Sequence, residues 1–206
     1  MAKSTRFSPG SQFFRALILA VSIIGISTSA LAQVPLVNAS FESPPLPNAQ
    51  TLNPMPSGLG WEIRGDVQLF NGFSTPWSTS NMQQHGRQWA FMRAGTTISQ
   101  TLALQPGTYV VSLQAAQAGP ANPAQIKVSL GSSSAALLTP DSTMGVMTFT
   151  GISIATAGSY VLTIEVPEPA PGTGFSYGVT LDDVIVGKLG TFSLPCGAKN
   201  INSGVQ

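Results

Sequence analysis

Three carboxylates stand in apolar surroundings and are the side chains best suited to bind an ion. Glu42 follows an aromatic residue, and Asp182 and Asp183 lie within the apolar segment 179–186. A carboxylate partly removed from water needs a cation or a hydrogen-bond donor beside it. Calcium with oxygen ligands is such a cation outside the cell, and local hydrogen bonds or a surface salt bridge are the alternative. Strict strand alternation places Asp182 on the face of Val184 and Asp183 on the other, so at most one of the two would face an ion.

Aromatic side chains offer a second kind of chemistry, the binding of sugars. A flat ring stacks on the apolar side of a pyranose, while Asn, Gln, Arg or Asp side chains bind its hydroxyl groups. Phe73 and Trp77 lie in the polar stretch 71–86, where the local pattern does not require burial. Trp61 begins an apolar strand and is expected in the core, whereas Trp89 could serve the core or a ligand.

Four polar residues are further candidates for contacts with a sugar. Arg93, Gln114 and Gln117 could line one face of a sheet, although exposed polar residues are ordinary on strands. His85 is the single histidine. It therefore lacks a second histidine or a cysteine for a metal site, and a local hydrogen bond is its expected role.

The sequence offers little that could support catalysis. It contains no His-Glu-x-x-His, no phosphate-binding loop and no Cys–His pairing. A glycosidase needs two carboxylates that flank a cleft. The chain has only eight acidic residues, and the closest apparent pair looks structural. We therefore expect a protein that is not an enzyme.

The N-terminal segment has the parts of a secretory signal peptide. Basic residues lead it, residues 16–26 are apolar, and Ala30 and Ala32 occupy the two positions that a signal peptidase reads. The apolar run is too short for a membrane span. We expect residues 1–32 to be removed on export and the mature protein to be extracellular or periplasmic, without stable membrane insertion.

The remaining chain carries six basic residues against eight acidic ones, a net charge of −2. No basic patch is available to displace counterions from nucleic acid or to bind an anionic membrane. Cys196 is the single cysteine and cannot form an internal disulfide. It is expected to be an incidental thiol, with intermolecular pairing as the alternative.

Apolar and polar residues alternate over most of the mature chain, as in strands with one buried face. In segment 108–115, Tyr109 lies on the apolar face and Gln114 on the other. Turn signals at 105–107 and 157–159 separate neighbouring strands. The other expected strands are 34–41, 61–70, 88–93, 97–104, 126–130, 147–154, 160–166 and 179–186. Nine or ten such strands predict an all-β sandwich of two sheets.

Two stretches interrupt this pattern. Residues 43–59 hold five prolines and are expected to form a long surface loop, and residues 71–86 form a second, polar loop. The alternation ends near residue 187. We therefore expect one domain at 33–187, followed by a flexible C-terminal tail at 188–206.

Several motifs lie in a familiar order along the mature chain. They are LVNASFE at 36–42, GW at 60–61, GRQWAF at 86–91, ISQT at 98–101, PGTY at 106–109 and LDDV at 181–184. In order and spacing they resemble the galactose-binding-like jelly-roll modules, a superfamily that contains many carbohydrate-binding modules of bacterial glycoside hydrolases. The resemblance covers about residues 34–187 and implies a jelly-roll sandwich.

The resemblance also implies a structural calcium ion. Glu42, Asp182 and backbone carbonyls near Ala39 would hold it, since alignment of the LDDV motif favours the first of the two neighbouring aspartates. Related modules often offer another acid at the turn before Gln88, where this sequence has Gln84-His85.

Two functions are consistent with these features. The first is a secreted, non-catalytic carbohydrate-binding-like module that holds a polysaccharide or glycan by aromatic stacking and neutral hydrogen bonds. Its candidate contacts are Phe73, Trp77, His85, Trp89, Arg93 and Gln114. The alternative is a structural or adhesive cell-surface domain of the same fold that contacts proteins and has no sugar site. Exposed aromatic residues in the 71–86 loop favour the first, and buried ones favour the second.

Overall fold

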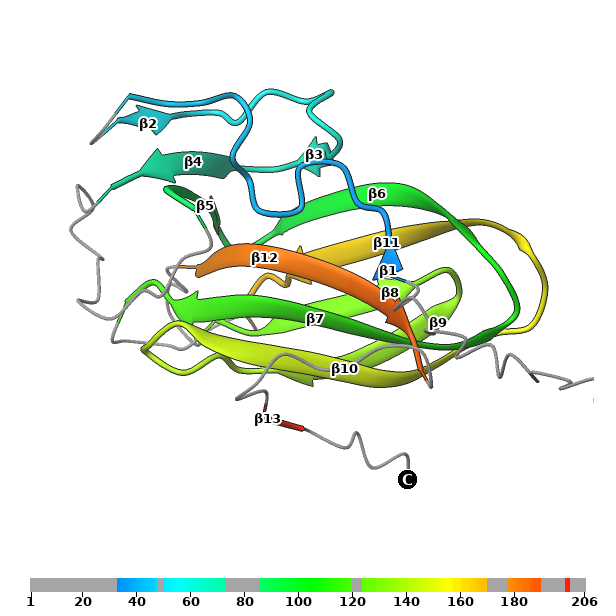
Figure 1. Ribbon diagram of the computed structural model, residues 1–206. Helices are drawn as coiled ribbons and strands as arrows, with labels where there is room; N and C mark the ends of the chain where they lie inside the picture. The colour runs from blue at the N-terminus through cyan, green and yellow to red at the C-terminus, as the bar shows by residue number, and fades with distance from the viewer. Residues whose placement is uncertain are drawn as a thin grey trace, which may run out of the picture.

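The computed structural model describes residues 33–47, 50–72, 86–119, 124–169, 178–189 and 199–200. These residues form strands β1 to β13 in two sheets (Figure 1). No described residue is helical, and none belongs to a helix long and apolar enough to cross a membrane. The expected all-β sandwich is confirmed. The expected signal peptide and Cys196 lie outside the described residues.

The larger sheet has the strand order β13-β10-β7-β12-β5-β4-β2 within the described chain, and β1 pairs with β12. Its strands are β1 (Gln33–Val34), β2 (Thr51–Leu52), β4 (Val67–Asn71), β5 (Gln88–Met92), β7 (Gly107–Gln117), β10 (Gly145–Ile154), β12 (Val179–Lys188) and β13 (Lys199–Asn200). The pairing of β13 with β10 is parallel, and the others are antiparallel.

The smaller sheet lies behind the larger one in Figure 1 and has the order β3-β6-β11-β8-β9. Its antiparallel strands are β3 (Glu62–Arg64), β6 (Thr96–Leu104), β8 (Ile126–Leu130), β9 (Ser133–Leu138) and β11 (Gly158–Val166). Strands expected at 97–104, 126–130 and 160–166 are confirmed, because each alternates apolar and polar residues without interruption.

The main core lies between the two sheets. Along β6, for example, Ile98 and Leu102 are buried, while Thr101 and Ala103 are exposed. Trp61 is buried in this core, as expected, with its ring centroid 5.7 Å from that of Phe41. Burying a large apolar side chain contributes about 1.5–3 kcal/mol, so these strand faces supply most of the stability.

Both predicted turns are confirmed, and a tyrosine hydroxyl holds each of them. The Tyr109 hydroxyl donates to the Gln105 carbonyl at 2.8 Å and accepts from the Gln105 N–H at 3.1 Å. The Tyr160 hydroxyl donates in the same way to the Thr156 carbonyl at 2.8 Å. In both cases the tyrosine binds the backbone of the residue four positions before it, and this bond fixes the turn between them.

The segment expected to be one strand at 34–41 is different. Only Val34 of this segment is in a strand, and residues 37–40 form a turn. Asn38 has a φ of 53° and Phe41 a φ of 55°, both in the left-handed region. The Asn38 side chain also binds the N–H and the carbonyl of Ser43, at 2.9 and 2.8 Å. This local side-chain bonding replaces the strand.

The expected strand at 61–70 is also divided. Its first part, β3, belongs to the smaller sheet, and its second part, β4, belongs to the larger one. The chain crosses at Gly65, whose φ is 94°. A Cβ atom at this position would lie 2.9 Å from Oγ1 of Thr96, so glycine allows both the backbone turn and the close approach.

A bulge interrupts β12 between Asp182 and Ile185. Asp183 occupies it with a φ of 50°. The extra residue places Asp182 opposite Gln114, on the sheet face away from the core, while Val184 turns into the core. The expectation that Asp182 and Val184 share a face is therefore wrong, because strict alternation does not allow for a bulge.

Three short strands lie outside the expected set. β2 falls in the proline-rich loop, and β9 follows β8 through a tight turn at Gly131, whose φ is 64°. β13 lies within the region expected to be a tail, where its two residues pair with Met147 and Thr148.

Candidate functional site

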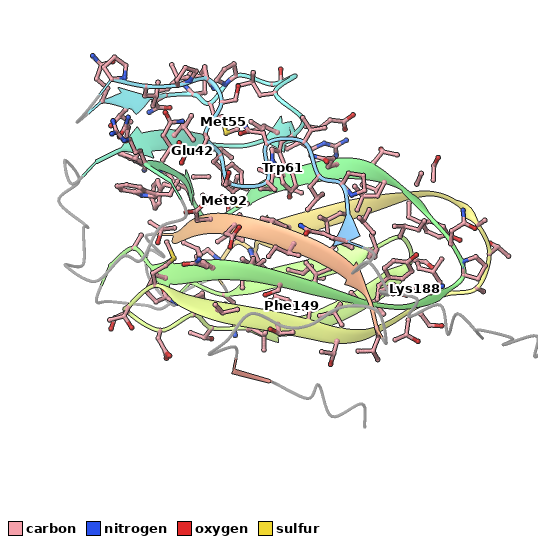
Figure 2. All side chains as sticks on the ribbon, viewed as in Figure 1. Glu42, Met55, Trp61, Met92, Phe149 and Lys188 are labelled. Carbon is pink, nitrogen blue, oxygen red and sulfur yellow. The ribbon has the colours of Figure 1, made fainter. Side chains whose placement is uncertain are left out.

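Glu42 lies where the N-terminal segment passes the start of β5 (Figure 2). Its Oε1 atom accepts hydrogen bonds from the backbone N–H groups of Arg87, at 2.7 Å, and Gln88, at 2.9 Å. Gly86 allows this approach, because a Cβ atom there would collide with the Glu42 carboxylate. The carboxylate therefore fixes the last residues before β5.

Gln88 connects the same segment to β5 from inside the sandwich. The side chain is 1% exposed. Its Nε2 donates to the carbonyls of Phe41, at 2.8 Å, and Pro44, at 3.0 Å, and its Oε1 accepts from the N–H of Leu46. These bonds give the irregular segment 41–46 the partners that a strand would otherwise supply.

Gln100 has the same role for the backbone at residues 37 and 60, which lies outside the strands. Its amide accepts from the Val37 N–H at 2.8 Å and donates to the carbonyls of Val37, at 3.0 Å, and Gly60, at 2.7 Å. Gln88 and Gln100 were not predicted as functional residues from the sequence. Their signal is a polar residue at a core position of an alternating strand, since Gln100 shares its face with Ile98 and Leu102.

The expected calcium ligands lie on the N-terminal segment and on β12, and both segments contact each other or β5 at one junction, formed by the turn at 37–40, the start of β5 and the bulge of β12. The Ala39 carbonyl accepts from the Val184 N–H at 2.9 Å, which ties the N-terminal turn to the bulge of β12. Asp182 is fully buried, and its Oδ1 accepts from the Asp183 N–H at 2.7 Å. Leu181 pairs with Ala90, so Asp182 comes next to the start of β5, which Glu42 also contacts.

This set of donors fits calcium in type. Carboxylate and carbonyl oxygens are the ligands that calcium prefers, and it takes six to eight of them. The described part of the chain has no group of three or more His, Cys, Asp or Glu side chains that could hold a metal ion. A calcium ion at this junction would therefore depend on backbone carbonyls and water for the ligands beyond Glu42 and Asp182.

A second apolar cluster lies on the other face of the larger sheet, away from the main core. Phe70, Trp89, Phe91 and Ala118 form it. The Phe70 ring lies 6.2 Å from Trp89 in a stacked arrangement and 6.2 Å from Phe91 in an edge arrangement. Trp89 is only 1% exposed. The Trp89 ring therefore packs beneath the surface of this face and is not accessible for stacking on a ligand.

Polar side chains share this outer face with the aromatic cluster. Strand pairing places Phe70 beside Trp89 and Asp182 beside Gln114, and Asp182 follows the residue opposite Ala90. Two expected site residues, Asp182 and Gln114, are thus paired across β12 and β7, and Trp89 lies on the neighbouring strand β5. Gln114 is half-buried. Within the described chain, Nε1 of Trp89 and Oγ1 of Thr148 have no hydrogen-bond partner.

Arg93 lies at the far end of this face, just after β5. Its Nε lies 2.7 Å from Oδ2 of Asp66, and the two side chains are 58% and 40% exposed. Gln68 on β4 donates to Oδ1 of Asp66 at 3.2 Å. Asp66 and Gln68 were not predicted from the sequence, because the contact of Asp66 with Arg93 depends on the pairing of β4 with β5.

Phe73, Trp77 and His85 lie outside the described residues. The residues on either side of them are described. Asn71 pairs with Gln88, and the Gly72 N–H donates to the Arg87 carbonyl at 3.3 Å. Loop 73–85 therefore starts and ends at the junction that Glu42 holds, and it joins the strands that carry Phe70 and Trp89.

Residues 174–178 form a Gly-x-Ser-x-Gly motif, the pattern found around the nucleophile of many serine hydrolases. In those enzymes the motif joins a strand to a helix. Here Gly178 leads directly into strand β12, and residues 174–177 lie outside the described chain. The motif therefore lacks the helix that a nucleophile elbow requires.

No family model matches the sequence, and no curated protein matches it. Among solved structures, the chain is similar to the carbohydrate-binding module TmCBM61 in complex with β-1,4-galactotriose, with 15% identity, a TM-score of 0.50, and coverage of 75% of this chain and 98% of that one. It is also similar to the CBM22-1 xylan-binding domain of Paenibacillus barcinonensis Xyn10C, with 14% identity, a TM-score of 0.44, and coverage of 71% and 96%. A third is a family 35 carbohydrate-binding module from Clostridium thermocellum, with 12% identity, a TM-score of 0.42, and coverage of 66% and 97%.

At such low identity this likeness shows the fold alone. The protein has a jelly-roll β-sandwich like that of TmCBM61, and the jelly-roll fold that the sequence motifs implied is confirmed.

Proposed function

We propose that the protein is an exported, non-catalytic module that binds a glycan through the outer face of its larger sheet and loop 73–85. The supporting observation is the composition of that face. An aromatic layer of Phe70, Trp89 and Phe91 lies beside Gln114 and the Asp66–Arg93 pair. Amide, guanidinium and carboxylate groups on a sheet face that is backed by buried rings suit the hydroxyl groups of sugars.

In this proposal the rings that stack on the sugar come from residues 73–85, which lie outside the described residues. Trp89 and Phe91 are buried, so they stabilise the face, and Phe73 and Trp77 are the residues that stack on the sugar. Both lie in the segment between Gly72 and Gly86, whose two ends are held by paired strands and by Glu42.

The test is depletion of the mature protein from solution by insoluble polysaccharides, with galactan, xylan and mannan compared. Galactan comes first because TmCBM61 was determined with β-1,4-galactotriose. We expect saturable depletion by a neutral polysaccharide. No depletion by any of them would instead favour the structural or adhesive role without a sugar site.

We also propose a structural calcium ion at the junction of the N-terminal turn, β5 and β12. Glu42 and Asp182 would hold it together with carbonyls near Ala39. When bound, the ion would neutralise the Glu42 and Asp182 carboxylates and cross-link segments far apart in the sequence. The support is the Ala39–Val184 hydrogen bond, which ties the N-terminal turn to the bulge of β12, and the contact of Glu42 with the start of β5.

A further inference from the structure

Asp66 is held in place by several neighbours, one of which is Arg93. The Asp66 carboxylate binds Nε of Arg93 at 2.7 Å and the Gln68 amide at 3.2 Å. The Asp66 carbonyl accepts from the Arg93 N–H at 3.2 Å and from the Thr96 hydroxyl at 3.3 Å. Gln68 itself is buried. Side chains held from several directions lose little entropy when a ligand binds them.

Much of this pair stays open to solvent. Arg93 is 58% exposed and Asp66 40% exposed, in contrast to the buried Phe91, which is Gln68's partner across the strands. The contact with Asp66 uses Nε of Arg93, and a guanidinium has further N–H donors on its two Nη atoms. Each carboxylate oxygen of Asp66 has lone pairs beyond those that accept the present bonds. Donors and acceptors are therefore offered side by side.

We infer that Asp66 and Arg93 form a polar subsite for neighbouring hydroxyl groups of a neutral sugar, an inference that rests on the proposed glycan binding. Adjacent hydroxyls act as both donors and acceptors, so one donates to Asp66 while the next accepts from Arg93. The formal charges of the two side chains cancel. The carboxylate of an acidic sugar would meet the Asp66 carboxylate beside Arg93 and gain no net attraction from the pair, so a neutral sugar is favoured.

The test measures binding to soluble β-1,4-galactan, xylan and polygalacturonate by affinity electrophoresis. The variants are Arg93→Lys, which keeps the charge but not the planar fork, and Asp66→Asn, which keeps the shape but not the charge. Lys127 and Glu165 provide the control, because they form an ion pair of similar exposure on the smaller sheet, 3.6 Å apart and 42% and 38% exposed.

We expect wild type to bind a neutral polysaccharide at least tenfold more tightly than polygalacturonate. Arg93→Lys and Asp66→Asn should each weaken that binding tenfold or more, whereas Lys127→Ala and Glu165→Gln should leave it unchanged. Equal melting temperatures for all four variants would exclude misfolding as the cause. Retained binding in both Asp66 and Arg93 variants, or preference for polygalacturonate, would overturn the subsite but not the glycan-binding function. No binding by wild type to any of these polysaccharides would overturn both.

Discussion

Glu42 Oε1 accepts the Gln88 N–H at 2.9 Å, and this bond links residues that are 46 positions apart. The Gln88 side chain returns to the same segment by donating to the Phe41 carbonyl at 2.8 Å. The two residues thus hold the N-terminal segment against β5 from both sides. Because loop 73–85 ends just before Gln88, the same contacts fix one end of the proposed binding loop.

Replacing Glu42 should destabilise the domain. Glu42→Ala leaves the N–H groups of Arg87 and Gln88 without their acceptor, and hydrogen bonds to a charged group contribute about 1.5–3 kcal/mol. Urea denaturation in the presence of chelator measures this loss apart from any metal effect. Glu62→Ala on the exposed side of β3 is the control, with an expected change within about 0.5 kcal/mol. Equal effects of the two variants would remove Glu42 from this role.

Trp61→Ala and Trp77→Ala should affect different properties of the protein: the first its stability, and the second its binding of glycan. Trp61→Ala loses the stacking on Phe41 and the hydrogen bond to the Asn38 carbonyl at 3.0 Å, so it should lower the free energy of unfolding by roughly 3–5 kcal/mol. Trp77→Ala should leave the melting temperature nearly unchanged and weaken glycan binding by about 1–3 kcal/mol. Calorimetry of both variants checks this. A Trp77→Ala variant as unstable as Trp61→Ala would assign Trp77 to the core.

Calcium should stabilise the folded state by a modest amount. Extracellular calcium sites have dissociation constants of about 10⁻⁴–10⁻³ M. Roughly 1 mM calcium then adds about 0.4–1.4 kcal/mol, which raises the melting temperature by about 1–6 °C. Chelator should reverse this shift, and magnesium should replace calcium poorly because it requires tighter octahedral geometry.

Two neighbouring aspartates make the calcium test specific. Asp182→Asn should abolish the shift, and Asp183→Asn should keep it, because the bulge places the two side chains differently. Superimposable melting curves of wild type with calcium and with chelator would show that Glu42 and Asp182 serve only as hydrogen-bond acceptors.

Export should leave a mature protein that begins at Gln33. Ala30 and Ala32 occupy the positions that signal peptidase reads. Mass spectrometry of the secreted protein should find this N-terminus, with or without cyclisation to pyroglutamate. Retention of residues 1–32 in the exported product would contradict the prediction.

The sequence predicted best the elements whose pattern is local. Strands such as β6 and β11 alternate along their whole length, so their buried faces follow from the residue order alone. It failed where one residue changes the backbone direction. The left-handed conformations of Asn38 and Asp183 and the crossing at Gly65 each disrupt a pattern that otherwise suggests a continuous strand.

The candidate site was harder to predict for a different reason. Asp66 contacts Arg93, and Gln88 contacts the segment 41–46, only because strands distant in sequence are paired. No local pattern contains that information. Trp89 illustrates the same limit, since alternation places it on the outer face of the sheet, yet packing buries it against Phe70.

Glycan binding by the mature protein is the central claim, and an oligosaccharide array tests it most directly. The array should carry β-1,4-galactotriose together with xylan, mannan and acidic oligosaccharides. We expect saturable binding of wild type to at least one neutral oligosaccharide, loss of that signal in Trp77→Ala, and an unchanged signal in Lys127→Ala on the opposite sheet. Absence of wild-type binding to every oligosaccharide, with the protein folded by its melting curve, would contradict the account.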